Sequence, residues 1–399
     1  MKLSVIIVNY NVKYYIAQCI ESLQRALQGI DSEVIVIDNH SQDGSCEYLK
    51  EHFPQLTLIE NIHNLGFARA NNIGIRQSQG EYVLLLNPDT FVAETTLQET
   101  LLFMDQHPQA GGLGVKMLNS DGSCAKESRR GIPTPATSFY KMSGLCSHYP
   151  QNRHFGKYYM SYLPWDSPQR IEIISGAFCL LRRKALDQIG LLDEDFFMYG
   201  EDIDLSYRLL KAGWENWYYP ATILHYKGES TYKSSFKYIH VFYQAMLIFF
   251  KKHYGQLSLL VTLPVQMAIY AKAFTALVCM MSGRMKKSLG FTDQNTACPP
   301  YYIFIGGKEA TERCRKIAFR HGLEAEFIAA TEDDCPDGHS QLSLNLNHGN
   351  RMTIVVYDTD SFRFQTILRC FHMSPDPHVR MGTFVNRHDT IITHYEIIR

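Results

Sequence analysis

The sequence lacks several features that would point to other classes of protein. Its 399 residues carry a formal net charge of −1, and no basic tract is long enough to attract nucleic acid. Neither a Gly-x-Gly-x-x-Gly motif nor a Walker P-loop follows the first hydrophobic run, which weighs against dinucleotide cofactors and ATPase chemistry. We therefore expect no nucleic-acid partner and no dinucleotide cofactor.

Cysteine pairs and leader signals are also missing. Ten cysteines occur without any Cys-x-x-Cys spacing, which argues against a structural zinc site. The first residues, MKLSVIIVNYN, show no signal-peptide cleavage pattern. We expect free thiols in a reducing cytoplasm, where disulfides rarely persist. The apolar fraction of 45% and the charged fraction of 20% are typical of a folded globular protein.

Hydrophobic runs of strand length alternate with stretches of helical periodicity in the first half of the chain. The predicted strands are Leu3–Val8, Glu33–Asp38, Leu56–Glu60, Glu81–Leu86 and Gly112–Lys116. Apolar residues recur at helical spacing from 16 to 27 and from 97 to 104. This alternation predicts an α/β fold with a doubly wound, mostly parallel sheet and right-handed crossovers.

The strand Glu81–Leu86 ends abruptly at Asn87-Pro88-Asp89. Pro88 cannot donate to a sheet ladder, so Asp89 is expected at the sheet edge where open α/β folds bind ligands. A carboxylate there suits a hard divalent cation that can hold a diphosphate. The alternative is an aspartate that closes an ordinary turn. Asp38 and Asn9 end two other strands, where Asp38 could accept a hydrogen bond from a nucleobase or ribose and Asn9 could line the crevice.

A second acidic cluster follows Gly200, where Glu201, Asp202 and Asp204 fall within four positions at a predicted helix start. The helix dipole favours acids there, so simple capping is one interpretation. The other is that a partly apolar surround raises the pKa of Asp202 towards that of a general base.

Taken together, SVIIVNYN, VIVIDNHSQDGS, NLGFARANN and LLLNPDT resemble the nucleotide-sugar half of family 2 glycosyltransferases over residues 1–255. The similarity is greatest to rhamnosyltransferase-like bacterial members that build surface polysaccharides. The resemblance implies a GT-A-like fold and a nucleoside-diphosphate sugar as donor, with Asp38 in contact with the base. The donor-binding residues that it implies are Asn9, Asp38, Asn64, Gly66, Asn71, Asn87, Gly176 and Ser230.

FMYGEDIDLSYR resembles the family's Glu-Asp motif, which implies Asp202 as general base on the acceptor hydroxyl and Glu201 as its supporting neighbour. The Asp-x-Asp-type motif reads Asn87-Pro88-Asp89 here, which leaves Asp89 to carry Mg²⁺ or Mn²⁺. His225 resembles the family's metal-binding histidine near the diphosphate. A lone histidine is otherwise a structural hydrogen-bonding residue.

The implied reaction is sugar transfer with inversion, in one in-line displacement, to a glycan or lipid-linked acceptor hydroxyl. The subgroup resemblance favours dTDP-rhamnose as donor. A sugar-1-phosphate nucleotidyltransferase is one rival, but it needs a Gly-rich basic loop after the first strand, and none is present. The other rival is a catalytically silent nucleotide-sugar-binding module. The presence of Asp89, Asp202 and His225 together argues against it, because binding alone would not need a base.

Three further segments complete the predicted organisation. Residues 118–170 are irregular, and we expect either a flexible region that orders over donor or acceptor or a solvated insertion. Residues 257–282 are apolar but interrupted by Pro264, Gln266 and Lys272. They predict an amphipathic segment on the cytoplasmic leaflet, peripheral at the inner face of the plasma membrane, or else a buried helix or dimer interface.

After a polar linker, the sequence predicts a second, smaller α/β unit of Rossmann-like build. Its predicted elements are the strands Tyr301–Ile305, Glu326–Ile328, Thr353–Tyr357 and Val379–Val385 and helices near Thr311–His321 and Phe362–Phe371. It holds no catalytic constellation, so an accessory role is expected. The predicted division is a catalytic domain over 1–255, a membrane-associating segment and linker over 256–299, and an accessory domain over 300–399.

Overall fold

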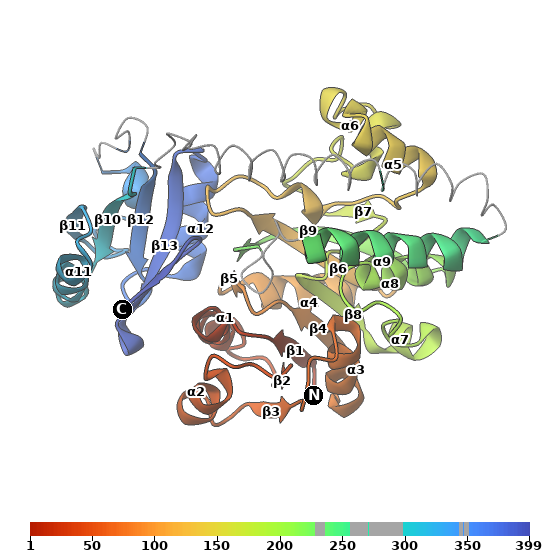
Figure 1. Cartoon of the computed structure of the whole chain (residues 1–399), viewed down its shortest axis with the longest axis horizontal. Coiled ribbons are helices and arrows are strands. Elements are labelled where there is room, and N and C mark those ends of the chain that lie inside the picture. The colour runs from red at the N-terminus through yellow and green to blue at the C-terminus, as the bar shows by residue number, and fades with distance from the viewer. Residues whose placement is uncertain (228–235, 256–269, 271–297, 343–345, 347–350) are drawn as a thin grey trace, which may run out of the picture.

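Two β-sheets organise the protein (Figure 1). The computed structural model describes residues 1–227, 236–255, 270, 298–342, 346 and 351–399. The first sheet and its helices are built from residues before 256, and the second sheet from residues after 298. The predicted α/β class with a small second α/β unit is therefore confirmed, while the exact domain boundaries stay a prediction.

The first sheet has nine strands in the order β3-β2-β1-β4-β8-β6-β9-β5, with β7 paired to β9. Their bounds are β1 Leu3–Asn9, β2 Ser32–Asp38, β3 Thr57–Glu60, β4 Tyr82–Leu86, β5 Thr90–Val92, β6 Ala110–Leu118, β7 Gln169–Ile171, β8 Phe178–Arg182 and β9 Glu215–His225. β3, β2, β1 and β4 run parallel, and β8 runs antiparallel to β4 and β6. The sheet is thus parallel in its first half and mixed beyond β4.

Helices cover both faces of this sheet. α1 (Lys13–Ala26), α2 (Ser45–His52) and α4 (Thr96–Gln106) pack on one face, and α3 (Phe67–Gln77), α7 (Arg183–Ile189) and α8 (Glu201–Lys211) pack on the other. The side chains of β1 divide between the two cores by alternation, Leu3, Val5 and Ile7 to the first and Ile6 and Val8 to the second. Burial on both faces explains why these strands are apolar throughout.

The stretch between β6 and β7 contains short helices rather than only irregular chain. They are η1 Lys126–Ser128, α5 Pro135–Met142, α6 Leu145–His148 and η2 Phe155–Tyr158. α5 and α6 are the yellow helices in Figure 1. Thr134 caps α5, because its hydroxyl accepts a hydrogen bond from the Thr137 amide and Pro135 opens the first turn. The sequence shows no long periodic pattern that predicts these helices, because each spans only one or two turns.

The second sheet has the order β11-β10-β12-β13-β14-β15. Its elements are β10 Tyr301–Gly306, α11 Lys308–His321, β11 Ala325–Ala329, η4 Gly338–Ser340, β12 Thr353–Asp358, α12 Phe364–Met373, β13 Val379–Val385, η5 Asn386–His388, β14 Thr390–Thr393 and β15 Ile397–Ile398. The first four strands are parallel, and β14 and β15 close the sheet in antiparallel fashion. Every strand predicted here is present within one residue at each end.

One apolar core is shared by the two sheets. Phe91 and Leu224 of the first sheet cluster with Val355 of the second and with Phe364 of α12. The Glu94 carboxylate accepts hydrogen bonds from the Phe364 amide at 2.9 Å and the Gln365 amide at 2.8 Å. It therefore satisfies the free N–H groups at the start of α12 from the opposite unit.

The described part of the chain contains no helix with both the length and the apolar character needed to cross a membrane. The predicted membrane-associating segment over 256–299 falls almost entirely outside the described residues. α9 (Phe236–Tyr254), which precedes it, packs Ala245 and Phe249 against Phe196 and Ile203 beside α8. The nine cysteines within the described residues are free, as the sequence predicted.

The turn into α8 has an unusual backbone. Tyr199 and Gly200 have φ angles of 68° and 86°, in the left-handed region. A Cβ atom at Gly200 would lie 2.9 Å from the Phe196 ring and 3.2 Å from the Ala245 Cβ. Glycine is therefore required here both for the backbone angle and for close packing of α9.

We expect Gly200→Ala to destabilise the protein more than Gly213→Ala. Both glycines have positive φ, but a Cβ at Gly213 (φ 88°) would meet nothing within 4 Å. Gly213→Ala should cost about 1–2 kcal/mol for the backbone angle alone, and Gly200→Ala about 1–3 kcal/mol more for overpacking. Urea unfolding of the two variants measures the difference, and equal losses would contradict the packing argument.

Candidate active site

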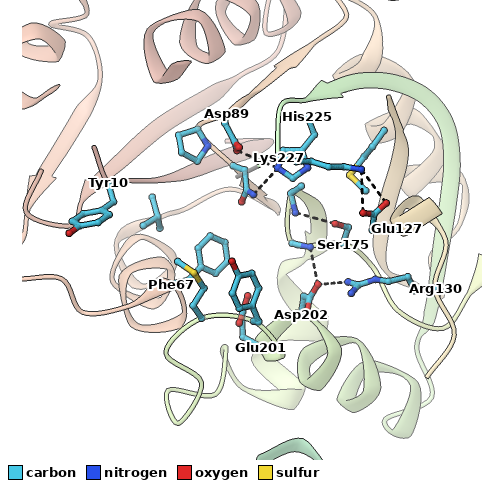
Figure 2. A pocket seen from close by; sticks show the side chains of 18 of the residues that line it. Tyr10, Phe67, Asp89, Glu127, Arg130, Ser175, Glu201, Asp202, His225 and Lys227 are labelled. Carbon is cyan, nitrogen blue, oxygen red and sulfur yellow. Dashed lines mark hydrogen bonds and ion pairs between the residues drawn. The ribbon is translucent and has the colours of Figure 1, made fainter. Parts of the chain in front are cut away.

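A cavity of about 400 Å³ opens at the carboxyl ends of β1, β4 and β9 (Figure 2). It is lined by residues of the first sheet, of the start of α8 and of the stretch between β6 and β7. The lining residues are Val8, Tyr10, Asn39, Asn64, Phe67, Asn87, Pro88, Asp89, Met117, Glu127, Arg130, Lys141, Tyr158, Tyr159, Ser175, Gly176, Ala177, Met198, Tyr199, Glu201, Asp202, His225 and Lys227. Among the predicted site residues, Asn64, Asn87, Asp89, Gly176, Glu201, Asp202 and His225 therefore share one cavity.

Asp89 and His225 meet because β5 pairs antiparallel with the end of β9, where Thr90 faces His225. His225 Nε2 lies 3.3 Å from Asp89 Oδ1 and 3.3 Å from Asn87 Nδ2. Asp89 is 3% exposed. Among the described residues no hydrogen-bond partner reaches Asn87 Oδ1, although this oxygen is buried.

These side chains can hold a divalent cation only as an open site, where other ligands complete the coordination. Nowhere in the described ranges do three or more His, Cys, Asp or Glu side chains gather around one point. The set consists of one carboxylate, one imidazole and the orphaned Asn87 Oδ1. Mg²⁺ is commonly bound by one or two carboxylates together with substrate phosphates, and imidazole suits transition metals. The residues fit a cation that a diphosphate helps to coordinate.

Asp202 is held from two sides at the first turn of α8. Its Oδ2 atom accepts hydrogen bonds from Arg130 and, at 3.3 Å, from the Gly176 amide (Figure 2). Its Oδ1 atom accepts from the Ile203 amide at 2.8 Å. Gly176 therefore lines the cavity while it orients Asp202. A Cβ at Gly176 would approach the Asp202 Cβ to 3.6 Å, an ordinary contact.

Glu201, beside Asp202, has a different environment. Burial raises the pKa of Glu201 well above its ordinary value, and the neighbouring Asp202 charge raises it further. Its Oε2 atom is buried without a hydrogen-bond partner among the described residues. Arg130, which is bonded to Asp202, lowers the pKa of Glu201 by less than burial raises it. The pair is therefore asymmetric, with an ion-paired Asp202 and a Glu201 that favours the protonated carboxyl.

The predicted base-binding residues are less directly exposed to the cavity. Asp38 is 1% exposed, and its oxygens accept from Asn9 Nδ2 at 2.7 Å and from the Ser41 amide at 2.8 Å. Neither Asp38 nor Asn9 is part of the cavity lining, whereas Asn39 is. A contact of Asp38 with a nucleobase stays a prediction, and the structure gives Asp38 the role of holding the loop after β2.

Gly66 and Asn71 also lie behind the cavity wall. A Cβ at Gly66 would lie 2.5 Å from the Phe197 carbonyl oxygen, so this glycine serves close backbone packing. Asn71 Nδ2 donates to the Phe67 carbonyl within α3 at 2.9 Å. Neither is among the lining residues. Ser230 lies outside the described residues, so its predicted donor contact has no counterpart here.

Sequence reasoning did not single out Lys141, Tyr158 and Tyr159, which come from the stretch between β6 and β7. Arg130 was likewise not among the predicted site residues. The one local signal is the cluster of three tyrosines beside a single lysine in GKYYMSYLPW. Such clusters also occur on solvated surfaces, so the sequence alone does not assign them to a site.

Comparison with known proteins decides the family. The model of glycosyl transferase family 2 matches residues 4–190. An N-acetylglucosaminyl-diphospho-decaprenol L-rhamnosyltransferase of Mycobacterium tuberculosis is 30% identical over 259 residues, which cover 62% of this chain and 83% of the relative. This chain belongs to glycosyl transferase family 2. The resemblance read from the sequence motifs is thus confirmed.

Further comparisons give lower similarity. A low-salt glycan biosynthesis hexosyltransferase of Haloferax volcanii is 29% identical to this family 2 chain over 210 residues, covering 52% of it and 61% of the relative. A mannosyltransferase from Pyrobaculum calidifontis, solved with GDP-Man and Mn²⁺, has 18% identity and a TM-score of 0.44, covering 73% of this chain and 81% of that one. S. aureus TarS 1-349 has 18% identity and a TM-score of 0.41, covering 62% and 65%.

The raised pKa of Glu201 predicts a pH-dependent cost in stability for this family 2 glycosyltransferase. Above the ordinary glutamate pKa the folded protein keeps a proton that the unfolded chain has lost, so folding stability falls as pH rises. A glutamine at this position cannot ionise, so Glu201→Gln should remove this loss of folding stability with rising pH. We expect the variant to gain on the order of 1–3 kcal/mol relative to wild type between pH 5 and pH 9.

Denaturant unfolding at several pH values tests this prediction. Glu51→Gln is the matched control, because it removes a carboxylate that is 76% exposed on α2. If Glu201→Gln and wild type follow the same pH dependence, Glu201 is ionised in the folded protein and the asymmetry of the pair is disproved.

Proposed function

We propose that this chain is an inverting, metal-dependent glycosyltransferase that moves a sugar from a nucleoside-diphosphate sugar to an acceptor hydroxyl. The observation that carries the proposal is one cavity with Asp89 and His225 on one wall and Asp202 on another. A carboxylate–imidazole pair suits a cation that binds the donor diphosphate, and an oriented carboxylate suits proton abstraction from the acceptor. Family membership supplies the reaction class.

In this mechanism Asp89, His225 and Asn87 Oδ1 would hold Mg²⁺ or Mn²⁺. When bound, the cation would stabilise negative charge on the departing diphosphate. Asp202 accepts the proton of the acceptor hydroxyl as the acceptor oxygen bonds to the anomeric carbon. The bond from that carbon to the diphosphate oxygen breaks, and its electron pair leaves with the nucleoside diphosphate. One displacement inverts the anomeric centre.

Arg130 and Gly176 act on this step through Asp202. The Arg130 guanidinium and the Gly176 amide both donate to Asp202 Oδ2 and so fix the direction of the carboxylate. Glu201, with its raised pKa, is poorly suited to serve as a carboxylate nucleophile. A single-displacement path with Asp202 as base is therefore favoured over a double displacement, which needs an ionised nucleophile beside the sugar.

The name of one relative supports a proposal for the substrates. We infer dTDP-rhamnose as donor and a lipid-linked saccharide carrying a diphosphate as acceptor, because a relative is named for rhamnosyl transfer to N-acetylglucosaminyl-diphospho-decaprenol. Such an acceptor would require contact with the cytoplasmic membrane surface, the role expected of residues 256–299. The catalytic unit is then residues 1–255, and residues 300–399 form the accessory unit that supports it.

Asp202→Asn tests the assigned base. We expect the turnover number to fall by about 10²–10⁴-fold while donor affinity is kept, because an amide cannot accept the hydroxyl proton. Nucleoside diphosphate release from a panel of nucleotide sugars measures turnover, and calorimetry measures donor binding. Asp195→Asn, at a side chain 69% exposed and outside the cavity lining, is the matched control. Full activity of Asp202→Asn would remove Asp202 from the mechanism.

Asp89→Asn tests the assigned cation site. We expect donor binding by the wild type to require Mg²⁺ or Mn²⁺, because the diphosphate shares the cation with Asp89. In the variant, adding the cation should no longer strengthen donor binding. Calorimetric titration of the donor with and without the cation measures this dependence. Wild-type donor binding that is indifferent to the cation would contradict the assignment.

A further inference from the structure

Most of the charged side chains that line the cavity have a partner. Glu127 forms an ion pair with Lys227 and Asp202 with Arg130, and the Asp89 carboxylate lies 3.3 Å from the His225 imidazole. Two charged residues are left over, Glu201 and Lys141. Because Glu201 favours its protonated form, Lys141 is the one positive charge in the described wall without a matching carboxylate.

Lys141 lies in the last turn of α5, where a lysine is favoured by the helix dipole. Its ammonium group nevertheless turns to the cavity wall. Lys141 Nζ donates to the Tyr158 hydroxyl at 2.8 Å and lies 4.0 Å from the centre of the Tyr158 ring and 5.5 Å from that of Tyr159. Among the described residues no carboxylate lies within ion-pair distance of it. Aromatic rings offset only part of the cost of holding a cation away from water.

This lysine lies on the acceptor side of Asp202. The Gly131 amide donates to the Tyr158 carbonyl at 3.1 Å, which ties η2 to the chain directly after Arg130. Arg130 in turn bonds Asp202, and Tyr10 and Phe67 lie on the opposite side of Asp202 (Figure 2). The donor is expected beside the ends of β1 and β2, where Tyr10 and Asn39 line the cavity. The base must touch the acceptor hydroxyl, so the rest of the acceptor is expected along the wall beyond Asp202.

We propose that Lys141, together with the Tyr158 hydroxyl, forms a subsite for a phosphate group of the acceptor. The proposal rests on the proposed function, because it takes Asp202 to mark the acceptor side. An ammonium group and a phenol both donate to phosphate oxygens, and a phosphate supplies the missing negative charge. In this proposal the donor diphosphate is held by Asp89 and His225, and Lys141 contacts only the acceptor.

A pair of acceptors tests the subsite by turnover. One is N-acetylglucosamine linked through a diphosphate to a short lipid, and the other is the phosphate-free glycoside with the same alkyl chain. We expect Lys141→Met to lower kcat/KM by about tenfold or more for the first acceptor, because one charge-assisted contact is lost. The KM for the donor and transfer to the phosphate-free acceptor should not change.

Two variants control for other effects of the substitution. Lys141→Arg keeps the charge and should retain most of the preference for the diphosphate acceptor. Lys126→Met removes an exposed charge from the same stretch, outside the cavity, and should behave as wild type. Thermal unfolding of each variant separates loss of binding from loss of folding. Equal losses of Lys141→Met on both acceptors would overturn the proposal.

A binding measurement decides the subsite independently of turnover. A soluble alkyl diphosphate is titrated into the full-length protein in the presence of EDTA, so that no cation assists binding at Asp89. We expect Lys141→Met to weaken this binding by about tenfold and Asp89→Asn to leave it unchanged. Unchanged binding in Lys141→Met would overturn the subsite. If the wild-type protein transferred sugar to neither acceptor, that result would instead contradict the proposed function. The titration would still decide the subsite.

Discussion

The pairing of β5 with β9 is the constraint on which the cavity depends. Pro88 ends β4, and the chain turns at once into β5, where Thr90 faces His225. The Tyr226 amide donates to the Asp89 carbonyl at 3.0 Å, which locks the turn to the end of β9. A shift of this register by one residue would send the His225 side chain to the other face of the sheet. The Asp89–His225 pair exists only because this short ladder forms.

Burial of charge shapes the rest of the cavity. Asp202 accepts hydrogen bonds from Arg130 and the Gly176 amide, whereas no ion pair within the described residues reaches Glu201 and burial raises its pKa. The two adjacent carboxyl groups thus have different surroundings, and those of Glu201 favour its protonated form. Tyr199 and Lys227, both with positive φ, also line the cavity. Such backbone angles persist only where the surrounding structure fixes them.

The second sheet supports the same elements that position the metal-binding candidates. Phe91 of β5, Leu224 of β9 and Tyr226 pack in one core with Phe364 of α12. Gln18 of α1 bonds Thr383 of β13 at 2.5 Å, and Glu94 caps α12 from the end of β5. This core backs the β5–β9 ladder, and no residue of the second sheet's unit is among the lining residues of the described cavity. The second unit therefore contacts the elements that position Asp89 and His225 without forming part of the cavity wall.

Local patterns in the sequence determined the buried strands, because apolar runs bounded by turn residues report burial directly. They also determined that Asp89 and Glu201-Asp202 lie at the ends of strands or helices. The donor contacts of Asp38, Gly66 and Asn71 stay predictions, and what the structure adds is their internal hydrogen bonds and close packing. Only the tertiary structure decided that Arg130 meets Asp202 and that Lys141 reaches the cavity. Those contacts join segments far apart in the chain, and no local periodicity encodes which distant partners meet.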